Sequence, residues 1–300
     1  MKSPSLILFI WLIAATFVLS SCNEKFDGFE KLDNGIFRKM NRFGEQSLSL
    51  KETDNAIVRI SYRQAAGTDS SADFDMYVGH LEMQGDTGNA LDSTLFHELQ
   101  LLKGGDDYSY IVPYTFYQNT FLDAFQGNFF KPEELTEIRV NVVRTFNASD
   151  FSNYLMNASQ AGELGETEAI DLLFLNNPSE VEMHGRVFLK RLIESNGDSV
   201  KAGRDVSLTY NTYLLNGTRL DSITEMQFNF GRPGQLIPGM TFALSLMKEG
   251  ERALVYMPSA LAFGEKGSST GIVPPRTPIY FDIRVKDVVK PEESLAQRKH

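Results

Sequence analysis

One pattern occurs twice in this chain of 300 residues, and the repeat limits the folds that the chain can adopt. Residues 95–105 align with residues 240–250 without a gap. Both segments have apolar residues at helical spacing and then a Lys and a Gly, which we expect to close a helix. In both copies an apolar segment then runs to a proline, Pro113 or Pro258. Each copy is therefore predicted to contain one short helix followed by a strand.

Two shorter matches occur in the same order along the chain. Residues 35–39 align with residues 185–190, and residues 58–62 align with residues 206–210. Apolar and polar residues alternate in these segments, as they do in strands with one buried face. We therefore expect an α+β protein of two similar domains, each a curled antiparallel sheet wrapped around a short helix.

The repeat and its flanks divide the chain into six segments. They are a signal peptide over 1–22, a tether over 23–34, a first domain over 35–146, a helical linker over 147–180, a second domain over 181–290 and a tail over 291–300. Within the linker, Ser149 is a candidate N-cap for a helix that reaches Leu164, and residues 166–175 are predicted to form another helix.

The first 22 residues have the regions of a secretory signal. Lys2 precedes an apolar run from Leu6 to Leu19, and small residues then lead to Cys22. Leu19-Ser-Ser-Cys22 resembles a bacterial lipobox, in which the cysteine is lipidated; the alternative is an ordinary cleaved signal. Cys22 is the only cysteine, so no disulfide can form within the chain. We expect a lipid anchor at Cys22 and a place in a bacterial cell envelope, at the outer membrane.

Composition argues against two classes of partner. The net charge is −10, and would be −11 without Lys2, with no basic cluster to offset it, so nucleic acid is not an expected partner. No metal site is expected, because the histidines are widely separated and no thiols join them. No cofactor is expected, and no phosphate-binding loop appears in the sequence. Those histidines are His80, His97, His184 and His300.

Six short motifs follow one another through the C-terminal copy. They are Leu208-Thr-Tyr210, Gly217-Thr-Arg-Leu220-Asp221-Ser222, Gln235-Leu-Ile237-Pro-Gly239, Met247-Lys-Glu-Gly250-Glu, Pro258-Ser-Ala-Leu-Ala-Phe263-Gly264 and Gly271-Ile-Val-Pro-Pro275. Together they make residues 185–290 resemble the FKBP-type peptidyl-prolyl isomerases. The fold that this resemblance implies is a twisted antiparallel sheet curled around a helix, in agreement with the repeat pattern.

The resemblance implies catalysis of rotation about X–Pro bonds. The barrier is about 18–20 kcal/mol because amide resonance must be broken. The twisted amide is less dipolar than the planar one, so an apolar pocket that excludes water favours the transition state. No nucleophile or general base is needed, and the sequence contains no arrangement that resembles a catalytic triad.

The resemblance also assigns the pocket residue by residue. Tyr210, Asp221, Ile237 and Phe263 are the predicted catalytic positions, with Asp221 at the rim and the Ile237 N–H holding a substrate carbonyl. Further predicted substrate-binding residues are Leu220, Phe228, Phe230, Leu236, Met240, Ile272, Val273 and Phe281. The sequence does not decide between Phe228 and Phe230, because residues 231–234 do not align cleanly with the family.

Three positions depart from the family pattern. Met240 stands where the family has a tryptophan floor, Phe263 where it has a tyrosine, and Leu220 where it has an aromatic residue. Loss of the tyrosine hydroxyl removes a hydrogen bond worth about 0.5–1.5 kcal/mol. We expect weak isomerase activity, or peptide binding with little turnover.

The N-terminal copy has fewer of the motifs. No Ala-Phe-Gly follows Pro113, and the Gly-Ile-Val-Pro-Pro motif has no counterpart there. We interpret residues 35–146 as a copy that keeps the fold and has lost the site. The expected function is therefore a membrane-tethered prolyl isomerase that acts on proline-containing exported polypeptides. The alternative is a non-catalytic chaperone or peptide-binding scaffold of the cell envelope.

Overall fold

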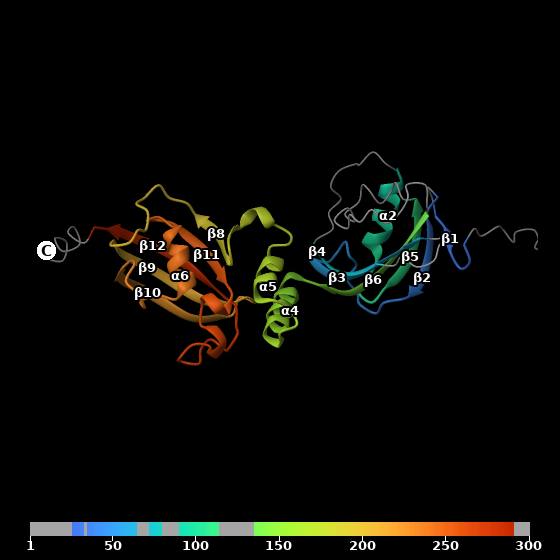
Figure 1. Cartoon of the computed structure of the whole chain (residues 1–300). Coiled ribbons are helices and arrows are strands. Elements are labelled where there is room, and N and C mark those ends of the chain that lie inside the picture. The colour runs from blue at the N-terminus through green and yellow to red at the C-terminus, as the bar shows by residue number, and fades with distance from the viewer. Residues whose placement is uncertain (1–25, 33–34, 65–71, 80–89, 114–134, 291–300) are drawn as a thin grey trace, which may run out of the picture. The chain divides into compact units, whose positions relative to one another are not determined.

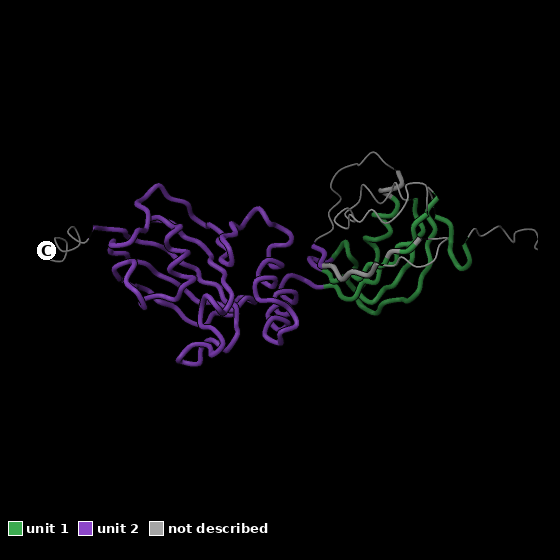
Figure 2. Tube along the Cα trace, in the orientation of Figure 1, with its two compact units in different colours: residues 1–52, 56–76, 81–145 green, residues 53–55, 77–80, 146–300 purple. Residues whose placement is uncertain are grey.

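The computed structural model describes residues 26–32, 35–64, 72–79, 90–113 and 135–290. The predicted signal with Cys22, and the predicted tail, lie outside these residues. The chain forms two compact units, one of residues 1–52, 56–76 and 81–145 and one of residues 53–55, 77–80 and 146–300 (Figure 2).

The first sheet has six strands in the order β1-β2-β5-β6-β3-β4 (Figure 1). The strands are β1 (Glu30–Lys31), β2 (Phe37–Arg42), β3 (Asn55–Gln64), β4 (Ala72–Gly79), β5 (Asp107–Pro113) and β6 (Leu135–Phe146). Its helix is α2 (Ala90–Leu101), which buries Leu95 and Leu99.

The second sheet also has six strands, in the order β10-β9-β12-β11-β8-β7. The strands are β7 (Glu182–His184), β8 (Val187–Ile193), β9 (Asp205–Leu214), β10 (Arg219–Asn229), β11 (Arg252–Met257) and β12 (Ile279–Val289). The helix α6 (Pro238–Ser245) packs against it through Met240, Ala243 and Leu244 (Figure 1).

The two sheets have the same topology. If β7 to β12 are matched in chain order to β1 to β6, the strand order of one sheet becomes that of the other. The bridge between Ser49 and Lys103 recurs between Ser199 and Lys248. The predicted α+β class with two similar domains is confirmed.

The Lys and Gly after each helix do not close it, which corrects the prediction. The helix α2 ends at Leu101 and α6 at Ser245, so these residues form the turn into the next strand. Gly105 has φ +97° and Gly250 φ +85°, a region that favours glycine. Their N–H groups donate to Val142 and Val285, which occupy equivalent strands.

Two bulges shift the register of β10, from which Leu220, Met226 and Phe228 pack against the buried cluster. The pairing of β10 with β9 shifts between Arg219 and Asp221 and again between Ile223 and Met226. Each bulge adds a residue that has no partner in the neighbouring strand, so the spacing of the half-buried residues is three up to Met226 and two after it. The half-buried apolar side chains of β10 are Leu220, Ile223, Met226 and Phe228.

The predicted linker helices belong to the second unit. They are α4 (Ala148–Ala161) and α5 (Glu166–Leu173). The N-cap of α4 is Asn147, whose side chain accepts from the Asp150 N–H, and not Ser149 as predicted. Asn147 has extended φ and ψ, which an N-cap requires, so the cap lies two residues before the predicted one.

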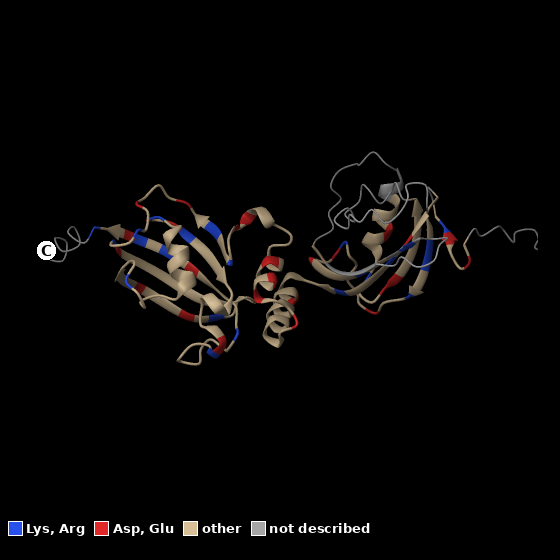
Figure 3. Cartoon of the chain, viewed as in Figure 1, with Lys and Arg blue, Asp and Glu red and all other residues tan. Residues whose placement is uncertain are grey.

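No helix among the described residues is both long and apolar enough to cross a bilayer. The described part of the chain also contains no cluster of side chains that could hold a metal ion. Lys and Arg are interspersed with Asp and Glu over both sheets (Figure 3).

The two sheets share an ion pair whose charges are exchanged. In the first, Asp107 of β5 accepts two hydrogen bonds from Arg139 of β6, at 2.8 and 2.6 Å. In the second, Arg252 of β11 donates two to Asp282 of β12, at 2.9 and 2.7 Å. The same cross-strand contact is therefore made with opposite polarity.

Replacing Asp107 with Asn should make the first unit less sensitive to acid. Burial raises the pKa of Asp107, but the bonds from Arg139 and Asn41 outweigh burial and hold it below the ordinary 3.8. A carboxylate with a lowered pKa stabilises the fold above its unfolded pKa, and this contribution is lost as pH falls through the folded pKa. Asp107→Asn should cost about 1 kcal/mol at neutral pH, because Arg139 is largely exposed, and less at acid pH.

The measurement is urea unfolding of the full chain between about pH 6 and pH 2. Parallel pH dependence in the wild type and the variant would contradict the assignment. Asp282→Asn is the matched control, because it removes the acid of the corresponding ion pair in the second unit.

Candidate functional site

The structure brings most of the predicted site residues together on the inner face of the second sheet. Phe230, Met240, Val273 and Phe281 are members of one buried hydrophobic cluster. The partly buried side chains that pack against this cluster include Tyr210, Leu220, Phe228, Leu236, Ile237 and Phe263. Asp221 and Ile272 are the two predicted residues outside it, and both are exposed.

The floor of this apolar cluster is fully packed. Met240 is 3% exposed and Phe281 2%. The Tyr210 ring stands edge-on to Phe281, with centroids 5.6 Å apart and planes at 78°. Gly239 lies so close to Met257 that a Cβ there would be 2.4 Å from its sulfur, so the start of α6 is pressed against β11. Met240 therefore fills the floor as a core residue.

The Asp221 carboxylate lies near the Tyr210 hydroxyl at the edge of the cluster. Leu220 and Asp221 follow the turn after β9, and the first bulge of β10 separates their register. The Asp221 carboxylate accepts the Ser222 N–H at 2.8 Å and is otherwise exposed. Burial raises the pKa of the Tyr210 hydroxyl above its ordinary 10.0, and the charge of Asp221 raises it further.

The Ile237 N–H is available at the start of α6. Ile237 is the N-cap of α6, with extended backbone and Pro238 at the first helical position. Its C=O accepts from Thr241, while its N–H donates to no described residue. An unpaired N–H at a helix N-terminus can donate to a carbonyl oxygen.

Phe228 and Phe230 are both placed at the site, and they lie differently. Phe230 is 6% exposed and belongs to the core, whereas Phe228 is partly exposed. Their ring centroids are 6.5 Å apart. Both, with Leu236, line a cavity of about 120 Å³ that residues 231–235 and Thr241 complete. An engineered apolar cavity of about 150 Å³ can hold benzene, so this space is close to that of a small ring.

The sequence did not predict Arg232 and Thr241 in this wall. The signal was present in Gly231-Arg-Pro-Gly234, a turn between a strand and the motif at Ile237. Its geometry could not be assigned because Gly231 and Gly234 both adopt positive φ, which the pattern of residue types does not specify.

The loop of residues 258–277 forms the other wall. Near its start are two 3-10 turns, η4 (Ser259–Leu261) and η5 (Gly264–Lys266), with Phe263 between them. Ile272 and Val273 follow η5, before β12 begins. Ile272 is 44% exposed and does not line a buried surface. Val273 is 4% exposed and anchors the loop to the cluster.

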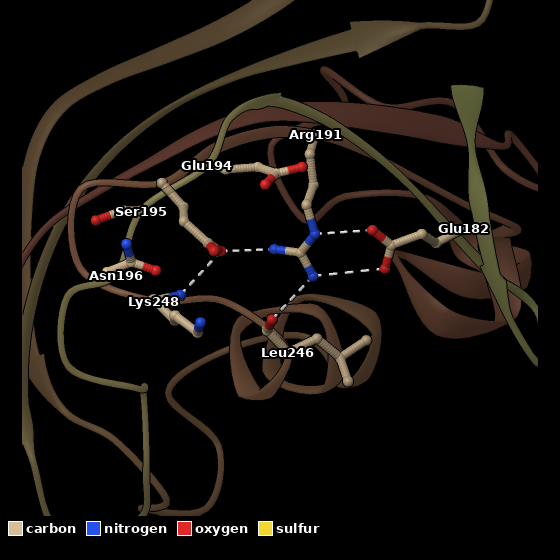
Figure 4. A pocket seen from close by; sticks show the side chains of 8 residues that line it. Glu182, Arg191, Glu194, Ser195, Asn196, Leu246 and Lys248 are labelled. Atoms are coloured by element: carbon tan, nitrogen blue, oxygen red, sulfur yellow. Dashed lines mark hydrogen bonds and ion pairs between the residues drawn. The ribbon is translucent and has the colours of Figure 1, made fainter. Parts of the chain in front are cut away.

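A second cavity, of about 340 Å³, has a polar lining (Figure 4). Arg191 lies at its centre and donates to Glu182, to Glu251 and to the Leu246 carbonyl. Glu251 also accepts the Lys248 N–H. These bonds use the donors of the guanidinium within the chain, so the cavity is an ion-pair network that joins β7, β8 and the turn after α6.

The first unit replaces part of the apolar core with charge. Glu98 of α2 accepts from Arg38 of β2 at 2.5 Å. In the repeat alignment these positions correspond to Ala243 and Leu189, which are fully buried. The buried Tyr110 hydroxyl has no partner among the described residues. The stretch that would match the Phe263 loop, residues 114–134, lies outside the described residues.

Comparison with known proteins identifies the second unit. Residues 197–286 match the family model described as FKBP-type peptidyl-prolyl cis-trans isomerase. The macrophage infectivity potentiator of Trypanosoma cruzi is 33% identical over 110 residues, which are 36% of this chain and 56% of that protein. The FK506-binding protein of Neisseria meningitidis is 28% identical over 108 residues, 35% of this chain and 97% of that protein.

A smaller share of a further relative aligns with this chain. A probable FKBP-type peptidyl-prolyl cis-trans isomerase FkpA of Neisseria meningitidis is 33% identical over 37% of this chain and 41% of that protein. This chain thus spans about half or less of several relatives. Among solved structures, an isomerase from Pseudomonas syringae aligns with 46% of this chain and 96% of its own, with a TM-score of 0.36 and 23% identity.

Titration of Tyr210 tests the arrangement at the edge of the site. We expect the Tyr210 hydroxyl to lose its proton above pH 10.0, and Asp221→Asn to bring its pKa back toward that value. Removing a negative charge favours the charged phenolate. The measurement is the difference in ultraviolet absorbance between each protein and the same protein carrying Tyr210→Phe. An unchanged Tyr210 pKa in Asp221→Asn would show that the two groups are not neighbours.

Proposed function

Since residues 197–286 belong to the FKBP-type peptidyl-prolyl cis-trans isomerase family, we propose that this chain catalyses X–Pro isomerisation through its second unit. The observation that carries the proposal is the coincidence of this family match with one apolar cluster. That cluster contains or contacts ten of the twelve predicted site residues.

The chemistry follows from the environment of the imide. An amide placed against Tyr210, Phe228 and Phe263 exchanges water for aromatic side chains. Planar amide resonance carries more charge separation than the twisted form, so this exchange favours the twisted state. A gain of about 1.4 kcal/mol in transition-state stabilisation gives a tenfold rate increase.

Two polar groups would orient the substrate. The Ile237 N–H is free to donate to the carbonyl of a bound peptide. Asp221 stands beside Tyr210 at the edge, where its charge acts on the amide dipole as the bond rotates. We assign these two groups positioning and electrostatic roles, and the apolar walls the exclusion of water.

The site has no tyrosine at position 263 and no tryptophan on its floor, so we propose a weak enzyme. Met240 is packed into the core and Ile272 is exposed, so neither forms a wall of an open pocket. The same facts support a second function, a scaffold that holds proline-containing segments without turnover. We further propose a lipid anchor at Cys22, exported polypeptides as substrates and an envelope location, all from the sequence of the signal.

Restoring the missing hydroxyl should improve the enzyme. Phe263→Tyr adds one donor at the edge of the pocket, and a hydrogen bond worth about 0.5–1.5 kcal/mol corresponds to roughly a two- to tenfold gain in kcat/KM. The measurement is a protease-coupled assay with a proline peptide, on the full chain.

The same assay separates the enzyme from the scaffold. Acceleration by the wild type that falls in Asp221→Ala supports catalysis. Measurable peptide binding with no acceleration, in both the wild type and Phe263→Tyr, would leave only the scaffold.

A further inference from the structure

The helices α4 and α5 contact the loops that surround the isomerase site. This hairpin lies before the region that matches the family, which begins at residue 197. Within the second unit it reaches the turn after β9 and both ends of the loop of residues 258–277. None of these contacts was expected from the sequence, which assigned residues 147–180 to a connection between domains.

Glu166, in the first turn of α5, holds the start of the loop. Its carboxylate accepts the Ser259 N–H and, at 2.7 Å, the Ser259 hydroxyl. Ser259 is 6% exposed, so its polar groups need partners within the protein. Hydrogen bonds to a carboxylate are stronger than those between neutral groups. Phe263 follows four residues later on the same loop.

Gln160, near the end of α4, holds the end of the loop. Its amide donates to the Thr277 hydroxyl at 3.2 Å, and that hydroxyl donates to the Pro275 carbonyl at 3.1 Å. Thr277 is 1% exposed. The preceding residue, Arg276, has φ +51° and donates its N–H to Gly264. A non-glycine residue with positive φ persists only where its neighbours hold it.

Aromatic and amide contacts fix the hairpin to the sheet. Phe174, which ends α5, packs edge-on against Tyr256 of β11, with centroids 5.1 Å apart. Tyr256 stacks on Tyr280, and Tyr280 on Tyr213, at 4.6 and 4.9 Å. At the other end, Asn216 donates to Asn153 of α4 at 2.9 Å, in the turn that precedes Leu220 and Asp221.

We propose that the α4–α5 hairpin is a positioning element for the isomerase site, in which Glu166 and Gln160 hold the two ends of the loop that carries Phe263 and Val273. Its catalytic consequence rests on the function proposed above. The hairpin keeps the loop closed over the apolar cluster, and Glu166 is its principal contact. The second unit thus includes a part of the chain that precedes the family match.

Substitution of Glu166 in the full chain tests this role. Glu166→Ala should raise hydrogen exchange at Ala262 and Arg276, whose N–H bonds lie within the loop, about tenfold, and lower kcat/KM about fivefold. Exchange in β11 and β12 should not change. Glu166→Gln should stay within about threefold of the wild type, because the Ser259 hydroxyl can turn to accept from the new amide.

Glu168 provides the matched control. It lies in the same turn of α5 and is exposed, with no hydrogen bond to another described residue. Glu168→Ala should leave both loop exchange and kcat/KM unchanged. If Glu166→Ala does not fold, Gln160→Ala tests the other end of the loop, since Gln160 lies on the surface and should tolerate the change.

The outcomes separate this inference from the proposed function. Wild-type loop exchange and wild-type kcat/KM in Glu166→Ala would overturn the positioning role and leave the isomerase intact. Faster loop exchange in a chain whose wild type has no activity would support the restraint on the loop and overturn the enzyme.

Discussion

The inner face of each sheet must be covered, and one short helix cannot cover it all. The helix α6 has eight residues and is therefore about 12 Å long. The strand β12 has eleven residues and is about 37 Å long. Several apolar side chains that pack against the buried cluster are left partly exposed, among them Tyr210, Phe228 and Phe263. The site is this uncovered part of the core.

A core with an uncovered end needs walls that hold their shape. On one side the bulged strand β10 turns Leu220 inward, and on the other Val273 anchors the loop of residues 258–277 to the cluster. That loop contains no strand, and buried hydroxyls at its two ends, Ser259 and Thr277, bond to α5 and α4. The hairpin thus contributes to the site through hydrogen bonds to the loop. The first unit has the same sheet, yet places the Arg38–Glu98 pair where the second has Leu189 and Ala243. Its inner face is correspondingly less suited to exclude water.

Much of this could be predicted from residue spacing, since alternation and helical periodicity report directly on which faces are buried. The matched segments at 95–105 and 240–250 became equivalent helices and turns. The family motifs placed Tyr210, Ile237 and Phe263 on one cluster. The charge-exchanged pairs Asp107–Arg139 and Arg252–Asp282 were not predicted, because their contact depends on cross-strand register.

The rest depends on tertiary packing that local pattern does not encode. The bulges of β10 change which residues face inward, and nothing in the composition of Leu220 to Phe228 marks where the register shifts. The linker helices were predicted, but an amphipathic helix does not specify which sheet it will meet. The stack from Phe174 to Tyr213 joins four residues from α5, β11, β12 and β9. Only the assembled fold brings them together.

Exchange spectroscopy by NMR on an X–Pro peptide, with catalytic amounts of the full chain, tests most directly whether an apolar surface drives the reaction. Leu220 is half-buried on an edge strand, so Leu220→Asn changes the polarity of the wall with little change in volume. We predict that the wild type accelerates cis–trans exchange. Leu220→Asn should reduce this acceleration about tenfold or more at unchanged stability. Equal acceleration by the two proteins would contradict a mechanism based on the exclusion of water.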